Sequence, residues 1–571
     1  MKAQLDYDAP RGRFVMECPF ALNWVAKGTP NRRWMSKDRH WSIPAIRANI
    51  KYLSEHMRQL ECTPGATGAI SEALDSYTRP ISRDRTPKFP PWYSFKTVPR
   101  VKQMEALNKV YDQKAIALFM DMRTGKTKVV IDLVCARRIE GKTDLMLIVC
   151  PLSIRKNWVR EIATHSPIPI DVHLLDTGKP KAFDKWLSEP HDFKCMIVGV
   201  ESFAAGSASK FAERFLLAGT RTVMVVDESS KIKNHRANRT KVCISLARKA
   251  ETRIVMTGTP IAQGPMDLFA QFEFLDPDII GIGDFFSFRN RYAVMGGYEG
   301  RQIVGYENLD ELMEIIEPFV FQVRKDEVFP DAPPKIYIRR EVQMNPEQKR
   351  LYKQMKKDAM VESGLQTLSV QNSLEKMLRL QQITGGLVAY LAPEGSDTKF
   401  MLERIPGNNP KIEELIDVSE EYDGPTIVWC VYKEEIRMVV DELRKKYGDE
   451  QVVELHGDVS EADRDRNVNV LFQGRRSRFL VGNAATGGMG LTMSVAEIEV
   501  YFSNSFNFTD RLQSEERAFG PDKKNGTVVV DIVAEGTVDH HVLEALASKQ
   551  SVSEYVRGSI DILKSKLFGD G

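Results

Sequence analysis

Two series of short, uninterrupted apolar segments constrain the fold of this chain more than any other feature. The first series, within residues 99–330, comprises IALFM, LMLIVCP, CMIVGV, TVMVVDE and TRIVMTG. The second, within residues 335–571, comprises TIVWCV, VVELHG, RFLVGN, IEVYFS and TVVVDIV. Strands that are apolar throughout are typical of parallel sheets whose two faces are both covered by crossover helices. The pattern predicts an α/β protein with two parallel-sheet domains in tandem.

The segments around these series set the predicted domain boundaries. Residues 1–60 indicate a small basic α+β module, and residues 61–98 are rich in Pro, Ser and Thr, which is typical of a linker. The first α/β domain is predicted over residues 99–330. An amphipathic helical lead-in over residues 331–410 precedes the second α/β domain, which is predicted over residues 411–571 and ends in helices.

The composition excludes several classes of protein. A chain of 571 residues has room for three or four domain-sized units. It has no apolar run of about eighteen residues, so no membrane span is expected, and its N-terminus lacks the apolar stretch of a secretory signal. The seven cysteines are scattered without a Cys-x-x-Cys pair, which argues against a zinc site and a disulfide framework. We therefore expect a cytoplasmic protein without zinc.

The charge is unevenly distributed along the chain. The net charge is +2, yet residues 1–100 hold 17 Lys and Arg against 9 Asp and Glu, a balance of +8. A basic N-terminal part on a mildly acidic body indicates a phosphate-rich partner. A solvated charged surface is the alternative, and charge alone does not decide between them.

The segment IALFMDMRTGKTKVVIDLV predicts a phosphate-binding loop between a buried strand and a helix. The backbone amides of such a loop meet the anion at the helix N-terminus. Here the loop consists of Met122, Arg123, Thr124 and Gly125. Lys126 would reach the outer phosphates of ATP, and the Thr127 hydroxyl would bind Mg²⁺. Met120 occupies the position of the first glycine in the full GxxxxGK[ST] pattern, so the loop alone does not settle the assignment.

A second motif supports nucleotide hydrolysis. Asp227 and Glu228 directly follow the apolar run TVMVV. At the end of a strand, Asp227 can hold Mg²⁺ while Glu228 orients the attacking water. An isolated Asp-Glu pair is more often an exposed turn, but a phosphate loop in the same α/β segment favours hydrolysis.

The order of motifs across residues 99–550 resembles helicase superfamily two, and within it the Swi/Snf-type ATPases and DNA translocases, including bacterial and phage members. The resemblance implies that the two α/β domains are tandem RecA-like domains. Gln103 occupies the place of the adenine-reading glutamine of that family. DESSKIKN resembles the hydrolysis motif, with Ser229-Ser230 in place of the usual pair. In MTGTPIAQGPMDLFAQFEFLDP, the resemblance implies that three residues couple hydrolysis to domain movement: Thr257, Gly258 and Thr259.

The resemblance also implies contacts with DNA in the first domain. LIVCPLSIRKNWVREI is similar to a strand and loop that touch the DNA backbone, and the matching residues are Pro151, Trp158 and Glu161. VGVESF is similar to a second contact loop, which contains Ser202.

In the second domain, HGDVSEADRDRNVNVLFQ resembles motif IVa and FLVGNAATGGMGLTMSVAEIEVYF resembles motif V. Motif V implies a DNA contact at Thr486 and nucleotide contacts at Gly488 and Gly490. NFTDRLQSEERAFGPDKK resembles motif VI, in which Gln513 contacts the nucleotide and Arg517 is the arginine finger. The family pattern Gln-x-x-x-Arg-x-x-Arg is incomplete, because its second arginine is replaced by glycine.

The substituted position is Gly520. Either Lys523 or Lys524 substitutes for the absent arginine, or Arg517 acts alone. Because an arginine finger contributes on the order of 10³–10⁵ in rate, this departure bears directly on activity.

The basic N-terminal segment resembles the substrate-recognition module of annealing-helicase-like relatives. Arg32 and Arg33 would neutralise phosphates, and Trp34 or Trp41 would stack on an unpaired base. The alternative is that both tryptophans form the core of a very small domain.

The resemblance implies an ATP- and Mg²⁺-dependent DNA translocase that acts on duplex or branched DNA in replication, recombination or repair. Two alternatives stay open: a motor that recycles RNA polymerase, and a DNA clamp that binds ATP without hydrolysing it.

Overall fold

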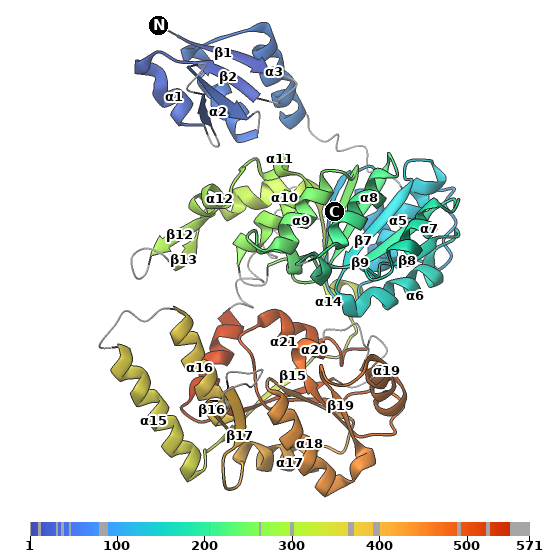
Figure 1. Ribbon diagram of the computed structural model, residues 1–571, viewed down its shortest axis with the longest axis vertical. Coiled ribbons are helices and arrows are strands. Elements are labelled where there is room, and N and C mark those ends of the chain that lie inside the picture. Colours follow the sequence, from blue (N-terminus) through green and yellow to red (C-terminus); the bar gives the residue numbers. More distant parts are fainter. Residues whose placement is uncertain are drawn as a thin grey trace. The chain divides into compact units, whose positions relative to one another are not determined.

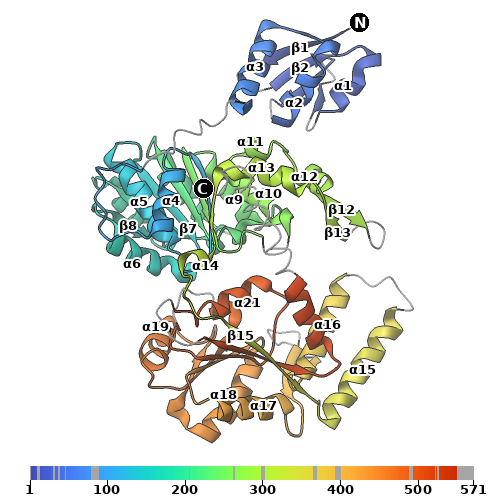
Figure 2. The same ribbon diagram turned by 180° about the vertical axis from the view of Figure 1, so that it is seen from behind.

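The computed structural model describes residues 2–8, 13–29, 32–35, 39–44, 47–78, 89–204, 206–261, 264–296, 302–363, 370–391, 400–487, 493–520, 523 and 526–548. The chain separates into two compact units with a boundary between Val328 and Phe329 (Figures 1 and 2). Within the described part, no helix is both long and apolar enough to cross a bilayer.

The N-terminal domain is a five-stranded sheet with three helices, in the strand order β3-β4-β2-β1-β5. Its elements are β1 (Ala3–Asp8), β2 (Arg13–Glu17), α1 (Asn23–Lys27), β3 (Arg33–Met35), β4 (His40–Pro44), α2 (Arg47–Glu55), β5 (Leu60–Cys62) and α3 (Pro64–Thr78). Alternate residues of β1 and β2 face the core, among them Leu5 and Phe14. The predicted α+β module is therefore observed.

The domain is longer than the sequence predicted. Strand β5 pairs in parallel with β1, and α3 buries Ala66 and Ile70 in the same core. The sequence predicts a linker from residue 61 because the Pro, Gly and Thr content of residues 61–78 hides these few buried positions.

The predicted linker is wrong at its other end as well. Phe89 and Tyr93 are buried against the first α/β domain, and the rings of Phe89 and Phe95 stack with centroids 5.5 Å apart. The Tyr93 hydroxyl donates to the buried Asp132 carboxylate at 2.9 Å. The aromatic residues of FPPWYSF therefore anchor this segment, while residues 79–88 lie outside the described part.

The first α/β domain contains a seven-stranded sheet in the order β14-β6-β11-β10-β7-β9-β8, and every neighbouring pair is parallel. The strands are β6 (Ala115–Met120), β7 (Leu145–Cys150), β8 (Asp171–Leu174), β9 (Lys194–Gly199), β10 (Thr222–Asp227), β11 (Thr252–Met256) and β14 (Val320–Val323). The five predicted strands are present. The two unpredicted strands, β8 and β14, form the edges of the sheet.

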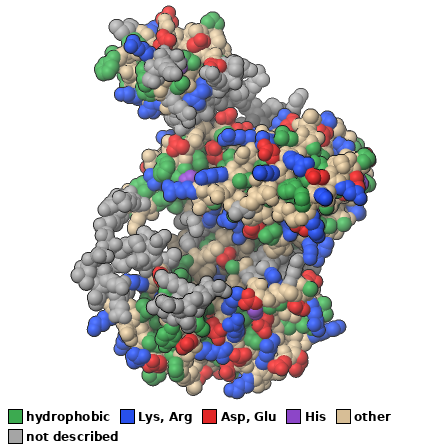
Figure 3. Space-filling model, viewed as in Figure 1, with side chains coloured by type: hydrophobic (Ala, Val, Ile, Leu, Met, Phe, Trp, Pro, Cys, Tyr) green, Lys and Arg blue, Asp and Glu red, His purple; other side chains and the backbone are tan. Residues whose placement is uncertain are grey.

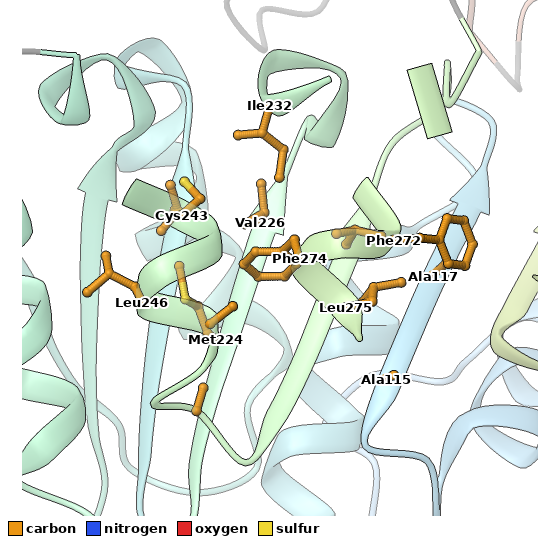
Figure 4. Packing of buried hydrophobic residues seen from close by; sticks show 14 of the residues in the cluster. Ala115, Ala117, Met224, Val226, Ile232, Cys243, Leu246, Phe272, Phe274 and Leu275 are labelled. Carbon is orange, nitrogen blue, oxygen red and sulfur yellow. The ribbon is translucent and has the colours of Figure 1, made fainter. Parts of the chain in front are cut away.

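Helices cover both faces of this sheet, as the continuous apolar strands require. One face carries α4 (Val101–Val110), α5 (Lys126–Ile139) and α6 (Arg155–His165). The other carries α7 (Pro180–Ser188), α8 (Ala208–Leu217), α9 (Asn238–Ala247) and α10 (Leu268–Leu275). Figure 4 shows Phe274 of α10 beside Met224 and Val226 of β10, and Phe272 on the side of α10 that faces Ala117 of β6.

The same unit continues through α11 (Pro277–Ile280), α12 (Phe285–Tyr292), β12 (Ala293–Gly296), β13 (Gln302–Tyr306), α13 (Leu309–Ile316) and α14 (Lys325–Val328). Strands β12 and β13 form an antiparallel hairpin that extends from α12 away from the main sheet (Figures 1 and 2).

The second unit contains a six-stranded parallel sheet in the order β15-β22-β21-β18-β20-β19. Its elements are β15 (Ile336–Val342), α15 (Pro346–Ser363), α16 (Val370–Thr384), β16 (Leu387–Leu391), β17 (Phe400–Arg404), α17 (Pro410–Glu421), β18 (Thr426–Cys430), α18 (Lys433–Tyr447), β19 (Val452–Leu455), α19 (Glu461–Asp465), a π-helix (Arg466–Phe472), β20 (Phe479–Asn483), α20 (Ala484–Gly487), β21 (Ile498–Tyr501), α21 (Phe508–Glu515) and β22 (Val528–Ala534). The predicted fold class, two RecA-like domains behind a small module, is confirmed.

Two details of the second unit differ from the prediction. The helical lead-in also contains β15, which joins the main sheet, and the antiparallel hairpin β16–β17. Of the predicted C-terminal helices, residues 538–548 are helical, and residues 549–571 lie outside the described part.

Candidate active site

Three functional loops meet at the carboxyl-terminal ends of three neighbouring strands of the first α/β sheet. Strands β6, β11 and β10 are neighbours, and the register pairs Leu118 with Met256 and Met256 with Asp227. Because the strands are parallel, the loops that follow them leave the sheet at the same edge. The phosphate loop, the Thr257 loop and the Asp227–Glu228 pair are therefore adjacent.

The phosphate loop has the backbone geometry that its glycine predicts. Gly125 has a φ of 89°, and an added Cβ there would lie 1.9 Å from Gln103 Nε2. The Gln103 amide donates to the Gly125 carbonyl at 3.2 Å and accepts from the Arg100 backbone amide at 2.8 Å. Gln103, the predicted adenine reader, is thus held against the loop, and no larger residue fits at position 125.

Lys126 begins helix α5 and is buried, as a phosphate-binding lysine in this loop must be. Its ammonium donates to the carbonyls of Met120 at 2.8 Å and Asp121 at 3.1 Å. Thr127 follows in the first helical turn and is half-buried, beside Thr124, whose hydroxyl donates to the Asp121 carbonyl at 2.7 Å. A turn at a glycine, a buried lysine that points into the loop and a helix N-terminus together fit the triphosphate of ATP.

The Asp227–Glu228 pair lies at the end of β10. Trp158 Nε1 donates to Asp227 Oδ2 at 2.9 Å, and the Glu228 backbone amide donates to Asp227 Oδ1 at 2.8 Å. Burial and the neighbouring Glu228 raise the pKa of the Asp227 carboxyl to about 7, against the opposing charge of Lys126. A buried carboxylate beside a second acid is an arrangement that a divalent cation would stabilise, so Asp227 and Thr127 fit Mg²⁺.

The Thr257 loop connects these two motifs. The Thr257 hydroxyl donates to Glu228 Oε2 at 3.4 Å and accepts from the Thr259 backbone amide at 3.0 Å. Gly258 lies against the phosphate loop, because an added Cβ would be 3.3 Å from the Met122 backbone nitrogen. Displacement of either motif would therefore change the contacts of this loop.

Two residues of this network were not predicted as site residues. Gln271 of α10 accepts from the Ser229 hydroxyl at 2.6 Å and donates to the carbonyls of Pro260 and Asp267. The signal for Gln271 was present, because it is the polar residue in the otherwise apolar run LFAQF. Trp158, which the sequence places in a segment similar to a DNA-contact strand and loop, is buried and donates to Asp227 in the hydrolysis motif.

The raised pKa of Asp227 gives a prediction about stability. The folded protein keeps a proton on this carboxyl up to about pH 7, whereas an ordinary aspartate loses it near pH 3.8, so the free energy of unfolding falls as the pH rises between these values. In the absence of Mg²⁺, we compare the free energy of unfolding of Asp227→Asn with that of wild type. We expect this difference to shift in favour of the variant by on the order of 2–4 kcal/mol between pH 4 and pH 7.5. Denaturant unfolding at both pH values measures this difference. An equal difference at both pH values would contradict the assignment.

The two predicted DNA-contact loops follow neighbouring strands. Pro151 directly follows β7 and is buried, while Ser202 lies half-buried in the 3₁₀ helix η5 (Val200–Phe203) after β9. The loops are joined, because the Leu152 backbone amide donates to Glu201 Oε2 at 3.0 Å.

Motif VI lies on and after helix α21 in the second unit. Gln513 is buried and Arg517 is half-buried. The helix is anchored by ion pairs, because Arg511 binds Asp531 at 2.5 Å and Lys335 binds Glu515 at 3.1 Å.

The surroundings of Gly520 and Lys523 bear on the second arginine that motif VI lacks. A Cβ at Gly520 would lie 3.0 Å from Ser494 Cβ, so the local packing leaves little room for a side chain. The Lys523 ammonium donates to the carbonyls of Ala496 and Ala518 and to the Thr527 hydroxyl. These three bonds engage the whole donor capacity of an ammonium within this unit, so Lys523 is a poor substitute. Lys524 lies outside the described part.

For motif V, α20 contains Thr486, whose side chain lies outside the described part, as do Gly488 and Gly490.

The predicted N-terminal residues share one corner of the small domain. Trp34 and Trp41 pair across β3 and β4, with ring centroids 5.1 Å apart. Trp41 Nε1 donates to Asn23 Oδ1 at 3.0 Å, whereas Trp34 is 49% exposed. Arg32 is exposed and lies 6.0 Å from the Trp41 ring, and Arg33 pairs with Ser42 in the strand register. Trp41 therefore has the structural role, and Trp34 has the face available for stacking.

Two RecA-like domains, one with a phosphate loop beside an Asp–Glu pair, define a helicase-type nucleotide-binding core. The model of the SNF2-related domain matches residues 21–385, and the helicase conserved C-terminal domain matches residues 409–519. The chain therefore belongs to the SNF2-related family.

Individual relatives are distant. The chain is 24% identical over 447 residues to YwqA of Bacillus subtilis, covering 76% of this chain and 46% of that protein. It is 22% identical over 571 residues to the SWI/SNF-related matrix-associated actin-dependent regulator of chromatin subfamily A-like protein 1 of Xenopus tropicalis, covering 95% and 54%. The chain thus spans about half the length of these curated relatives.

Among solved structures, the Sulfolobus solfataricus SWI2/SNF2 ATPase core in complex with dsDNA is similar at 20% identity with a TM-score of 0.38. That match covers 83% of this chain and 98% of the archaeal one.

Proposed function

We propose that this protein is an ATP- and Mg²⁺-dependent translocase that moves on duplex or branched DNA during replication, recombination or repair. The observation that carries the proposal is the convergence of the Lys126 loop, the Asp227–Glu228 pair and the Thr257 loop at one sheet edge. Family membership and the second RecA-like domain support a motor rather than a simple NTPase.

The residues at this edge have separate tasks in hydrolysis. Lys126 exchanges its two loop carbonyls for oxygens of the β- and γ-phosphates. Thr127 and Asp227 would hold Mg²⁺, which neutralises charge that develops on the phosphates. Glu228 orients the attacking water, and Arg517 supplies positive charge from the second domain.

The Thr257 loop provides the coupling. Its hydroxyl contacts Glu228 while Gly258 contacts the phosphate loop, so loss of the γ-phosphate changes both neighbours of one short segment. The bond between Leu152 and Glu201 would keep the two DNA-contact loops moving as one body. A cycle of hydrolysis would then advance the domains along the backbone.

The N-terminal domain would select the DNA structure. Arg32 and the exposed face of Trp34 offer a cation and a stacking surface side by side, which suits a junction between duplex and single strand.

The test is ATP hydrolysis without nucleic acid and with single-stranded DNA, duplex, forked DNA or RNA. We expect stimulation by duplex or forked DNA, and loss of the fork preference in Trp34→Ala. Hydrolysis that no nucleic acid stimulates would contradict the translocase. ATP binding without turnover would favour the ATP-gated clamp, for which the Gly520 substitution is the specific observation.

A further inference from the structure

The segment directly after the Asp227–Glu228 pair is strongly basic. Residues 231–241 contain no acidic residue and five cations, which are Lys231, Lys233, Arg236, Arg239 and Lys241. The segment runs from the 3₁₀ helix η6 (Ser229–Ile232) into α9. In Figure 3, Lys and Arg side chains gather on this unit over α9 and α12.

An aromatic residue of α12 holds two arginines of this surface. The guanidinium carbons of Arg236 and Arg289 lie 5.7 Å and 5.3 Å from the Phe286 ring centroid. Phe286 is 51% exposed, so the two guanidinium groups that it holds lie at the surface of this unit. The neighbouring rings of His235 and Phe285 stack with centroids 3.9 Å apart and fix the basic segment on α12.

The charges of this surface are not neutralised. Among the described residues, no carboxylate lies within 4 Å of Arg236, Arg239, Lys241 or Arg289, whereas Lys233 pairs with Asp267 at 3.3 Å. The Nε atoms of Arg239 and Arg289 are buried without a hydrogen-bond partner. Burial and the charges of Arg236 and Lys241 lower the pKa of His235, as expected where positive charge is concentrated.

The aromatic support explains how the surface is ordered without loss of charge. A carboxylate would fix an arginine but cancel its charge, whereas an aromatic face holds the guanidinium and leaves its N–H groups for another acceptor. Planar guanidinium groups of this kind suit phosphate oxygens.

The surface is continuous with a predicted DNA-contact loop. Helix α9 packs against η5, which contains Ser202. We propose that Arg236 and Arg289, held by Phe286, together with Arg239 and Lys241 form an additional binding surface for the phosphate backbone of a nucleic acid. The inference rests on the proposed function only in taking DNA as the ligand, and it requires no hydrolysis.

The experiment is fluorescence anisotropy with a labelled duplex and a labelled single strand, at several salt concentrations, on the full chain without ATP. We expect Arg236→Ala/Arg289→Ala to weaken binding roughly tenfold and to reduce the slope of log K against log salt by about 2, because two phosphate contacts are lost. Phe286→Ala should give a smaller loss in the same direction, since both cations remain but are no longer held.

Arg214→Ala is the matched control. Arg214 also lies over an aromatic ring, 5.4 Å from Phe183, but its charge is paired with Asp184 at 2.8 Å. Its replacement should leave the slope unchanged, and thermal melting should show that all variants are folded.

The outcomes separate this inference from the proposed function. Loss on either DNA form supports the surface and identifies the strand form that it contacts. Tight wild-type binding with the same slope in Arg236→Ala/Arg289→Ala and Arg214→Ala overturns the surface but leaves the translocase intact. A wild-type chain that binds neither DNA overturns both.

Discussion

Replacement of Arg517 with alanine is expected to lower the kcat of DNA-stimulated ATP hydrolysis by about 10³–10⁵. The physical reason is that phosphoryl transfer spreads negative charge over the γ-phosphate, which a second-domain arginine can neutralise only in the closed state. Lys523 is engaged within its own unit and Gly520 carries no side chain, so Arg517 has no evident substitute among the described residues. The measurement is steady-state hydrolysis at saturating ATP and duplex DNA.

Two variants make the result specific to the guanidinium. Arg517→Lys should recover only a small part of the loss, because a lysine cannot reproduce the planar fork of donors. Arg350→Ala removes an exposed arginine of α15 that pairs with Glu347, and it should leave kcat unchanged. A kcat for Arg517→Ala within a few-fold of wild type would reject the arginine-finger role.

Replacement of Glu228 with glutamine is expected to lower kcat by about 10²–10⁴ while ATP binding is retained. Glutamine keeps the size of the side chain and can still meet the Thr257 hydroxyl, but its neutral amide lacks the carboxylate charge that orients the attacking water. Single-turnover hydrolysis measures the chemical step, and binding of a fluorescent ATP analogue measures occupancy.

Lys126→Ala provides the contrast, because it should weaken ATP binding as well as hydrolysis. Lys126 directs its ammonium into the phosphate loop after β6, whereas Glu228 follows β10, which is separated from β6 by β11. If both variants lost ATP binding equally, Glu228 would have a structural role, and the assignment of separate tasks would fail.

The strands that the sequence predicted are those buried on both faces. All five apolar runs in each α/β domain form strands, because continuous burial leaves a continuous apolar signal. The missed strands lie at sheet edges. Strand β15 (IYIRREV) is interrupted by three consecutive charged residues, and β8 is only partly buried, so neither stands out from a loop or a helix.

The candidate site was predictable where a motif dictates a local conformation. The Gly125 turn, the buried Lys126 and the strand end at Asp227 are local consequences of the sequence. Long-range contacts were not predictable. The bond from Trp158 to Asp227 joins residues 69 positions apart, and only the fold brings α6 beside β10.

The N-terminal boundary failed for a related reason. The Pro, Gly and Thr of residues 61–78 are loop-like in composition, but Ala66 and Ile70 complete the core of a small sheet. In so small a domain, a few buried positions outweigh local composition.

The most direct test of the central claim is ATP-dependent displacement of a labelled third strand from a DNA triplex. A translocase that moves along duplex DNA must displace that strand when ATP is hydrolysed, and must fail to do so with a non-hydrolysable analogue or in Glu228→Gln. We predict displacement that requires ATP, Mg²⁺ and a duplex arm on which the motor can load. Robust DNA-stimulated hydrolysis without displacement would contradict directed movement.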